Sequence, residues 1–464
     1  MKLVIAGGGG FRVPQIIEVL SAAREGKGPH SGLNVDEVAL YDIDQRRLDV
    51  MMAVIRGMDF AHPPTLTAST DLRQALTGAN FVFSAIRVGG TAGRVTDERV
   101  ALAEGILGQE TVGVGGYAYA FRTLPIAMEL ARAVREVAPD AWVINFTNPA
   151  GIITQAMRRQ LGSRVIGICD TPIGLVRRVS AAAGIDHHWV DQDDPRLTFD
   201  YVGLNHLGWL RSLELDGTDR LPDLLADDAA LDHIEEARTI GFEWVRALGM
   251  LPNEYLFYYY LNRESVARIR QEKATRGEFL DKQQSAFYDE AAGASDHDAA
   301  AAWTRVHDER EATYMAESRD EEDRANRRDE DIAAGGYQQV AFDLMNSLTT
   351  GTRARMILGV GNSDADGDLI VPQLREDAVI EVPCRVDADG VHPQHVRPVT
   401  GPELGLITTV KGCEELVIEA ATQGDSTLAW RAMANHPLVD SVAVARRVLE
   451  GYIDQSPQIA KVFE

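Results

Sequence analysis

Short apolar runs alternate with amphipathic segments over the first 185 residues of the chain. The apolar runs have the length of buried strands and lie at 2–6, 37–41, 80–86, 141–146 and 164–168. Around them, apolar residues recur with helical spacing near 12–23, 45–57, 95–107, 123–138, 149–161 and 172–183. Because strands and helices alternate, we expect an α/β fold built on a Rossmann-type, doubly wound parallel sheet.

The pattern of the second half of the chain is different. Longer strand-like stretches at 197–202 and 209–215 predict the start of a second, mixed sheet. We therefore predict a dinucleotide-binding Rossmann domain over residues 1–192. We expect a mixed α+β domain over residues 193–464, with the boundary in the polar turn near 190–196.

Within this second domain, residues 285–335 are dense in Asp, Glu and Arg. Such a composition is typical of an exposed, salt-bridged helical excursion. Further along, we expect a turn at 361–367, a strand at 379–386 and helices between 404 and 451.

Composition and charge exclude several classes of function. The formal charge is −24, from 46 Lys and Arg against 70 Asp and Glu, so we expect neither nucleic acid nor an anionic membrane as a partner. No run approaches the ~20 apolar residues of a membrane span, and because a strand pattern starts at Lys2 we expect no signal peptide. Three cysteines cannot form a complete disulfide framework, and we expect a cytoplasmic protein.

A glycine cluster marks the turn from the first strand to the first helix. It consists of Gly7, Gly8, Gly9 and Gly10, followed by Phe11 and Arg12. At such a turn the backbone approaches a pyrophosphate and the helix N-terminus favours negative charge. Arg12 replaces the third glycine of the usual pattern, so a tight turn without a nucleotide is the alternative.

Asp42, at the end of the second predicted strand, favours the nucleotide interpretation. An acid at this position accepts hydrogen bonds from the ribose hydroxyls of NAD and disfavours the 2′-phosphate of NADP. A loop insertion at 26–32 accounts for the long separation in sequence between the glycines and Asp42.

Polar side chains also cluster where later strands end. Arg87, Asn148 and Cys169 each follow a predicted strand, and a further polar segment spans 203–209. In a doubly wound sheet the carboxyl ends of the strands face the ligand crevice, so the first three should converge beside a nicotinamide.

Together with the segments 108–116, 252–260 and 381–384, these residues make the chain resemble glycoside hydrolase family 4 over nearly its whole length. Enzymes of this family depend on NAD and a divalent metal, and they depart from two-carboxylate hydrolysis. Within the family the chain looks most like the 6-phospho-β-glucosidases. The resemblance implies a lactate/malate dehydrogenase-like fold, in which residues 193–464 would serve substrate binding, metal binding and oligomerisation. As cofactors it implies NAD with Mn²⁺ or another divalent cation.

The resemblance also implies roles for individual residues. Cys169 and His206 match the metal ligands, and Tyr255 matches the base that removes a proton from C2 of the sugar. Asp170 is a departure, because the β-acting relatives usually carry Asn there, whereas Asp is typical of α-acting members, in which it helps to protonate the leaving group. The expected contacts to the substrate, a glycoside with or without a 6-phosphate, come from Asn148, Arg94, Arg87 and Arg276.

Alternatives stay open at this point. An ordinary lactate- or malate-type dehydrogenase would share the nucleotide site, but it has no need of Cys169, His206 and Tyr255. A catalytically silent NAD-binding sensor is a second alternative. The anomer and the 6-phosphate are undecided, and we expect a homodimer or homotetramer.

Overall fold

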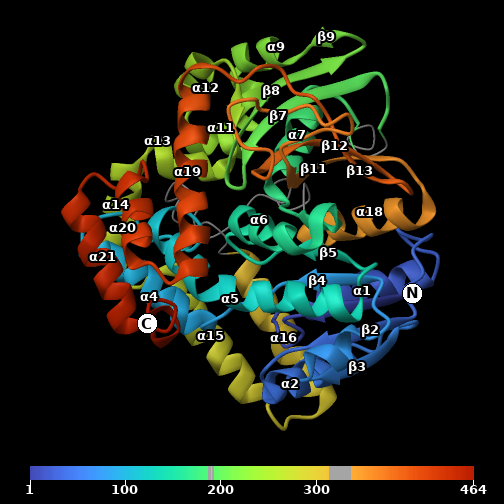
Figure 1. Ribbon diagram of the computed structural model, residues 1–464. Helices are drawn as coiled ribbons and strands as arrows, with labels where there is room; N and C mark the ends of the chain where they lie inside the picture. The colour runs from blue at the N-terminus through green and yellow to red at the C-terminus, as the bar shows by residue number, and fades with distance from the viewer. Residues whose placement is uncertain (187–189, 191–192, 313–335) are drawn as a thin grey trace.

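The computed structural model describes residues 1–186, 190, 193–312 and 336–464 (Figure 1). In this part of the chain 13 strands form one sheet, in the order β10-β8-β7-β12-β11-β6-β5-β4-β1-β2-β3, with β13 beside β12 and β9 beside β8. The strands are β1 (Lys2–Ala6), β2 (Glu37–Tyr41), β3 (Thr65–Ser69), β4 (Phe81–Ser84), β5 (Trp142–Asn145), β6 (Val165–Gly167), β7 (Leu197–Leu204), β8 (Leu207–Leu215), β9 (Thr218–Asp219), β10 (Leu251–Pro252), β11 (Ala354–Gly361), β12 (Val379–Asp387) and β13 (Gly390–Pro393).

The N-terminal half of the sheet is parallel from β3 to β6, which confirms the Rossmann-type prediction. Its helices are α1 (Val13–Arg24), α2 (Gln45–Gly57), α3 (Leu72–Leu76), α4 (Gly90–Ala103), α5 (Gly113–Val137), α6 (Ala150–Leu161) and α7 (Thr171–Ala182), with a short 3-10 helix η1 (Gly162–Arg164). Strand β3 was not predicted, because it lies at the sheet edge and its side chains are exposed or half-buried.

Helix α5 begins ten residues before the predicted start at 123. Its first turns contain glycines, which have poor helix propensity. The structure explains them by close packing, since a Cβ on Gly115 would lie 2.2 Å from the carbonyl oxygen of Gln109.

The prediction of a second sheet was wrong. Strand β11 pairs antiparallel with β6 through Gly359 and Gly167, and β12 pairs with β7 through Glu381 and Gly203. The strands of the second half therefore continue the Rossmann sheet. The predicted domain boundary falls partly on residues 191–192, outside the described part of the chain, and the division into two domains stays a prediction.

Helices of the second half lie at the β8 and β10 end of this sheet and pack on the helices α2, α4 and α5 of the first half (Figure 1). They are α9 (Leu221–Ala226), α10 (Asp228–Asp232), α11 (Glu235–Ile240), α12 (Phe242–Leu248), η2 (Glu254–Leu256), α13 (Phe257–Tyr260), α14 (Asn262–Gln271), α15 (Arg276–Ala291), α16 (Asp296–Ala312), α18 (Tyr337–Thr350), α19 (Gly401–Gln423), α20 (Ser426–Asn435), α21 (Val442–Gln455) and α22 (Pro457–Ala460). None of the helices in the described ranges has the length and apolar character needed to cross a bilayer.

The charged segment 285–335 differs from its prediction. The end of α15 and all of α16 form a hairpin packed against α2 (Figure 1). Trp303 and Val306 are buried there in a cluster with Phe11 and Met51. The segment is therefore not simply a solvated excursion. Its remaining residues, 313–335, lie outside the described part.

Candidate active site

The glycine cluster forms a tight turn between β1 and α1. Gly7 has φ +96°, and a Cβ there would lie 2.5 Å from the carbonyl oxygen of Ala85; a Cβ on Gly8 would lie 2.7 Å from Cβ of Leu40. The carboxylate of Asp42 accepts a hydrogen bond from the N–H of Gly9 at 3.0 Å. Side chains would fill this cradle, so the glycines suit the close backbone approach that a dinucleotide requires.

Phe11 and Arg12 complete the predicted cofactor-binding set in different ways. Arg12 is the N-cap residue of α1 and stands where an anion would meet the helix. The ring of Phe11 is buried against Phe287 and Trp303, so only the backbone of this residue faces the loop.

Three predicted residues follow adjacent parallel strands. Arg87 comes after β4, Asn148 after β5 and Cys169 after β6, so the sheet brings all three to its carboxyl edge. The hydroxyl of Thr147 accepts the N–H of Ile86 at 3.0 Å and ties two of these loops together. Oδ1 of Asn148 is buried and has no hydrogen-bond partner among the described residues, which is typical of an atom reserved for a ligand.

The two predicted metal ligands are linked by a chain of contacts. Sγ of Cys169 lies 3.4 Å from Oγ1 of Thr171, which accepts a hydrogen bond from Nδ2 of Asn253 at 2.8 Å. Oδ1 of Asn253 accepts the N–H of Tyr255 at 3.1 Å, and the ring of Tyr255 stacks on His206 with centroids 3.7 Å apart. The structure thus places Cys169, Tyr255 and His206 in one connected group.

His206 lies in the turn between β7 and β8 with φ +64°, and it is almost fully buried. Burial lowers its pKa to about 3, so the imidazole is neutral at physiological pH. Its Nδ1 is buried and lacks a hydrogen-bond partner within the described ranges. A neutral ring with an unused nitrogen fits a metal ligand.

Cys169 is also buried, and burial together with the charges of Glu381 and Asp170 raises the pKa of its thiol. A bound cation would reverse this effect, because metal coordination deprotonates a thiol. Asp170 is the N-cap residue of α7, and its side chain makes no capping hydrogen bond, which leaves the carboxyl group available to a ligand.

Sequence reasoning missed Glu381 as a site residue. It sits on β12, one oxygen accepts a hydrogen bond from Asn205 at 2.9 Å, and the other is buried without a partner in the described structure. Burial raises the pKa of Glu381 to about 7. The available signal was a single acid inside an apolar strand, a position where charge is costly.

The predicted arginines meet at another missed residue, Glu110. Both Arg87 and Arg94 form ion pairs with its carboxylate, and Nε of Arg94 also donates to Glu98 at 2.7 Å. Burial opposes ionisation, but the two guanidinium groups outweigh it and lower the pKa of Glu110 to about 2. Glu110 therefore stays ionised and holds the two guanidinium groups at the site.

Arg276 lies at the start of α15 and reaches this network indirectly. The neighbouring N–H of Gly277 donates to Glu98 at 2.8 Å, whereas the Arg276 guanidinium lies 5.1 Å over the ring of Phe279. The structure thus joins Arg87 and Arg94 through Glu110, and it places Arg276 next to Gly277, whose N–H meets the Glu98 partner of Arg94.

A cleft with about 380 Å³ of empty volume opens beside His206. Its lining includes Asn205, Tyr117, Tyr259, Glu414 and His436. Hydroxyl, carboxylate, amide and imidazole groups around one cleft suit a ligand rich in hydroxyls.

Comparison with known families identifies the arrangement. The model described as Family 4 glycosyl hydrolase matches residues 2–185, and the model of the Family 4 glycosyl hydrolase C-terminal domain matches residues 201–439. The chain belongs to glycosyl hydrolase family 4. The resemblance noted in the sequence is thereby confirmed.

Relatives of this family 4 glycosidase include enzymes named for opposite anomers. The chain is 29% identical to the 6-phospho-alpha-glucosidase 1 of Lacticaseibacillus paracasei, over 97% of this chain and 96% of that protein. It is 28% identical to the 6-phospho-beta-glucosidase of Escherichia coli K12, over 99% and 97% of the two chains.

Among solved structures, the 6-phospho-beta glucosidase of Thermotoga maritima with NAD and glucose-6-phosphate has a TM-score of 0.77 to this family 4 glycosidase. The two are 25% identical, and 98% of each chain is covered. The same T. maritima enzyme has also been solved with manganese, NAD⁺ and glucose-6-phosphate, with a TM-score of 0.78 and 24% identity.

Proposed function

We propose that this family 4 glycosidase hydrolyses 6-phosphorylated glucosides and uses NAD⁺ and a divalent cation, Mn²⁺ in the first instance. The connected group of Cys169, Tyr255 and His206 carries the proposal, because Cys169 lies at the same carboxyl edge of the parallel sheet as the glycine cradle. The relatives support the proposal, since they are named for activity on 6-phosphoglucosides or have been solved with NAD and glucose-6-phosphate. A dehydrogenase acting on 2-keto acids would have no use for this group.

The glycine turn and Asp42 would hold the dinucleotide, and Cys169 with His206 would hold the cation. When bound, NAD⁺ would accept hydride from C3 of the sugar and later return it, while the cation would polarise the C3 oxygen. No group of three or more candidate ligands assembles among the described residues. Substrate oxygens and water would therefore complete the shell, as in an open catalytic site.

The proton transfers fall to two residues of this chain. Tyr255 would remove the proton from C2, and its phenol is held in place by the stack on His206 and the backbone bond to Asn253. Asp170 would give its proton to the departing glycosidic oxygen. Asn148 would accept a hydrogen bond from a sugar hydroxyl through its unused Oδ1.

The arginine network is the proposed site for the 6-phosphate. Arg87 and Arg94 are held together by Glu110, and Arg276 lies next to Gly277, whose N–H donates to the Glu98 partner of Arg94. Guanidinium groups bind phosphate through paired N–H donors.

We propose the β-anomer as the first substrate. The α-anomer is the second candidate, and Asp170 is the observation that favours it. A carboxyl group at the N-terminus of α7, free of capping bonds, can protonate a leaving group, whereas an asparagine cannot.

One experiment separates these specificities. The full chain is assayed with α- and β-nitrophenyl glucosides, each with and without a 6-phosphate, in the presence of NAD⁺, Mn²⁺ and a thiol. We expect hydrolysis of a 6-phosphorylated substrate only, its loss after rigorous removal of NAD⁺, and solvent deuterium at C2 of the product.

Equal activity without NAD⁺ would overturn the mechanism. Equal activity on the unphosphorylated glucosides would overturn the phosphate assignment. Tyr255→Phe should lower the rate on every substrate, and an unchanged rate would remove Tyr255 from its role.

A further inference from the structure

The dinucleotide loop is covered by a segment that lies far from it in sequence. Helices α15 and α16 pack beside α2 (Figure 1), and their buried side chains contact Phe11 in the turn that follows β1. The fit is close, since a Cβ on Gly57 at the end of α2 would lie 1.8 Å from the carbonyl oxygen of Asp296. The hairpin is therefore a fixed part of the nucleotide site.

Two side chains of the hairpin donate hydrogen bonds to loop carbonyls. The hydroxyl of Tyr288 donates to the carbonyl of Gly9 at 2.6 Å, and the indole N–H of Trp303 donates to the carbonyl of Phe11 at 2.7 Å. Arg47 of α2 also donates to the Gly9 carbonyl at 3.3 Å and to the Tyr288 hydroxyl at 3.0 Å. Both donors from the hairpin are buried.

Aromatic packing fixes the same loop from the side. The ring of Phe11 meets Phe287 edge-on at 5.3 Å and stacks on Trp303 at 5.6 Å. The imidazole ring of His307 stacks on the indole of Trp303, with the ring centroids 4.7 Å apart. The loop is thus held at two carbonyls and one side chain.

We propose that Trp303 and Tyr288 are positioning residues that set the affinity of the glycine loop for NAD⁺. The inference rests on the proposed use of NAD⁺. A glycine-rich loop samples many conformations, and ordering it on binding would weaken affinity. With the carbonyls of Gly9 and Phe11 tied to the hairpin, the peptide groups of the loop are oriented before the pyrophosphate arrives.

Two aromatic-to-aromatic substitutions test this idea. Trp303→Phe removes the indole N–H and keeps an aromatic ring, and Tyr288→Phe removes only the hydroxyl. One such hydrogen bond is worth about 0.5–1.5 kcal/mol. We therefore expect each variant to raise the Kd for NAD⁺ by about three- to tenfold, measured by calorimetric titration of the full chain.

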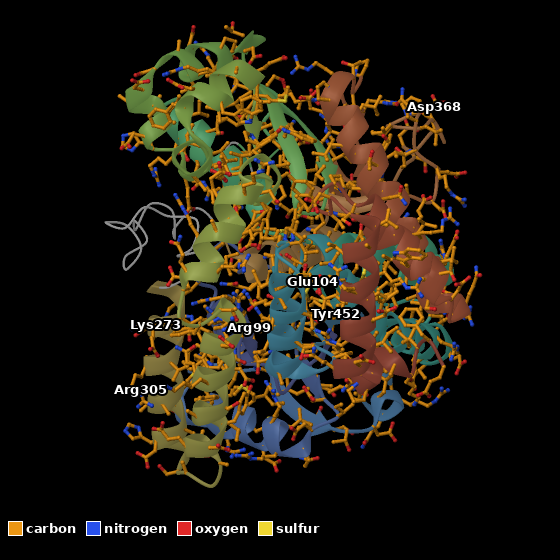
Figure 2. The ribbon with its side chains drawn as sticks, turned by 90° about the vertical axis from the view of Figure 1, so that its left-hand side faces the viewer. Arg99, Glu104, Lys273, Arg305, Asp368 and Tyr452 are labelled. Carbon is orange, nitrogen blue, oxygen red and sulfur yellow. The ribbon has the colours of Figure 1, made fainter. Side chains whose placement is uncertain are left out.

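Two control variants separate the chemistry of the change from its location. Trp430→Phe removes an indole N–H that donates to the carbonyl of Val442 at 2.9 Å, on the far helices of the chain. Arg305→Ala removes an ion pair with Glu290 on the outer surface of the hairpin, where Figure 2 shows Arg305 at its edge. Both should bind NAD⁺ like the wild type.

A purely structural role of Trp303 is distinguished from a role in binding by comparing the affinity for NAD⁺ with thermal stability. If Trp303→Phe and Trp430→Phe lower the melting temperature of the NAD-free protein alike, only the former should weaken NAD⁺ binding. At saturating NAD⁺ and phosphorylated substrate, kcat of Trp303→Phe should return to within about twofold of the wild type, because the loop is then filled. Tyr288→Phe provides the same test if Trp303→Phe does not fold.

Unchanged Kd values in Trp303→Phe and Tyr288→Phe would overturn the proposal, and so would an equal loss of affinity in Trp430→Phe. A wild-type protein that binds no NAD⁺ would instead overturn the proposed function.

Discussion

Gly277 shows how closely the arginine network is packed. Its N–H donates to buried Glu98, and a Cβ at this position would lie 2.6 Å from Oε2 of Glu98 and 3.1 Å from Cγ of Arg94. Gly277→Ala must therefore displace the carboxylate or the first turn of α15. Because Glu98 also accepts from Nε of Arg94, the displacement reaches a residue proposed to contact substrate.

The expected loss of stability follows from these contacts. Overpacking of a buried site costs about 1–3 kcal/mol, and a strained hydrogen bond to a charged group adds roughly 1 kcal/mol. The better helix propensity of alanine returns about 1 kcal/mol. We expect the free energy of unfolding to fall by about 2 kcal/mol and KM for a 6-phosphorylated glucoside to rise more than kcat falls.

The assay pairs urea unfolding with steady-state kinetics. Gly405→Ala on α19 is the matched control, because no atom lies within 4 Å of a Cβ built there. Alanine should stabilise that helix by up to about 1 kcal/mol. If Gly277→Ala unfolds like Gly405→Ala and keeps a wild-type KM, the packing of Glu98 under α15 does not determine the position of Arg94.

Three further predictions concern the site and its support. Cys169→Ser and His206→Ala should each abolish turnover but leave NAD⁺ binding, measured by calorimetry, intact. A near-normal rate of either variant in the presence of a chelator would exclude that residue as a metal ligand. Asp170→Asn should slow alkyl glycosides by about 10²–10⁴ yet barely affect nitrophenyl glycosides, whose leaving group needs no proton; a uniform loss would indicate a positioning role. Arg122→Gln breaks a fully buried bidentate ion pair with Asp97 and should cost about 3–5 kcal/mol in thermal or urea unfolding, and a wild-type unfolding curve would refute this.

Local patterns predicted the glycine turn, Asp42 and the residues at the strand ends. Each of these depends on a short stretch of sequence and on one rule, that ligands meet the carboxyl edge of a parallel sheet. The metal pair Cys169 and His206, and Tyr255, came from the family resemblance. The structure adds the contacts that join these three residues, and such contacts cannot be inferred from the spacing of residues along the sequence.

The misjudged hairpin shows where sequence patterns fail. Its exposed ion pairs, such as Arg305 with Glu290, dominate the composition. The buried residues Ala299, Trp303 and Val306 nevertheless follow a helical spacing of four and three, which a count of charges conceals. Glu110 was missed for a different reason, since its importance depends on two arginines that only the folded chain brings to it.

The position of β11 has a consequence for the newly made protein. The free edge of β6 ends at Gly167, but the strand that covers it begins at Ala354, 187 residues later by subtraction of these positions. At ~5–20 residues per second, the ribosome needs roughly 10–40 s to supply it. During that interval the nascent chain presents an unpaired parallel-sheet edge, the kind of surface on which strands of other chains add. Biosynthesis of this protein therefore depends on keeping that edge apart from its neighbours until the last quarter of the chain arrives.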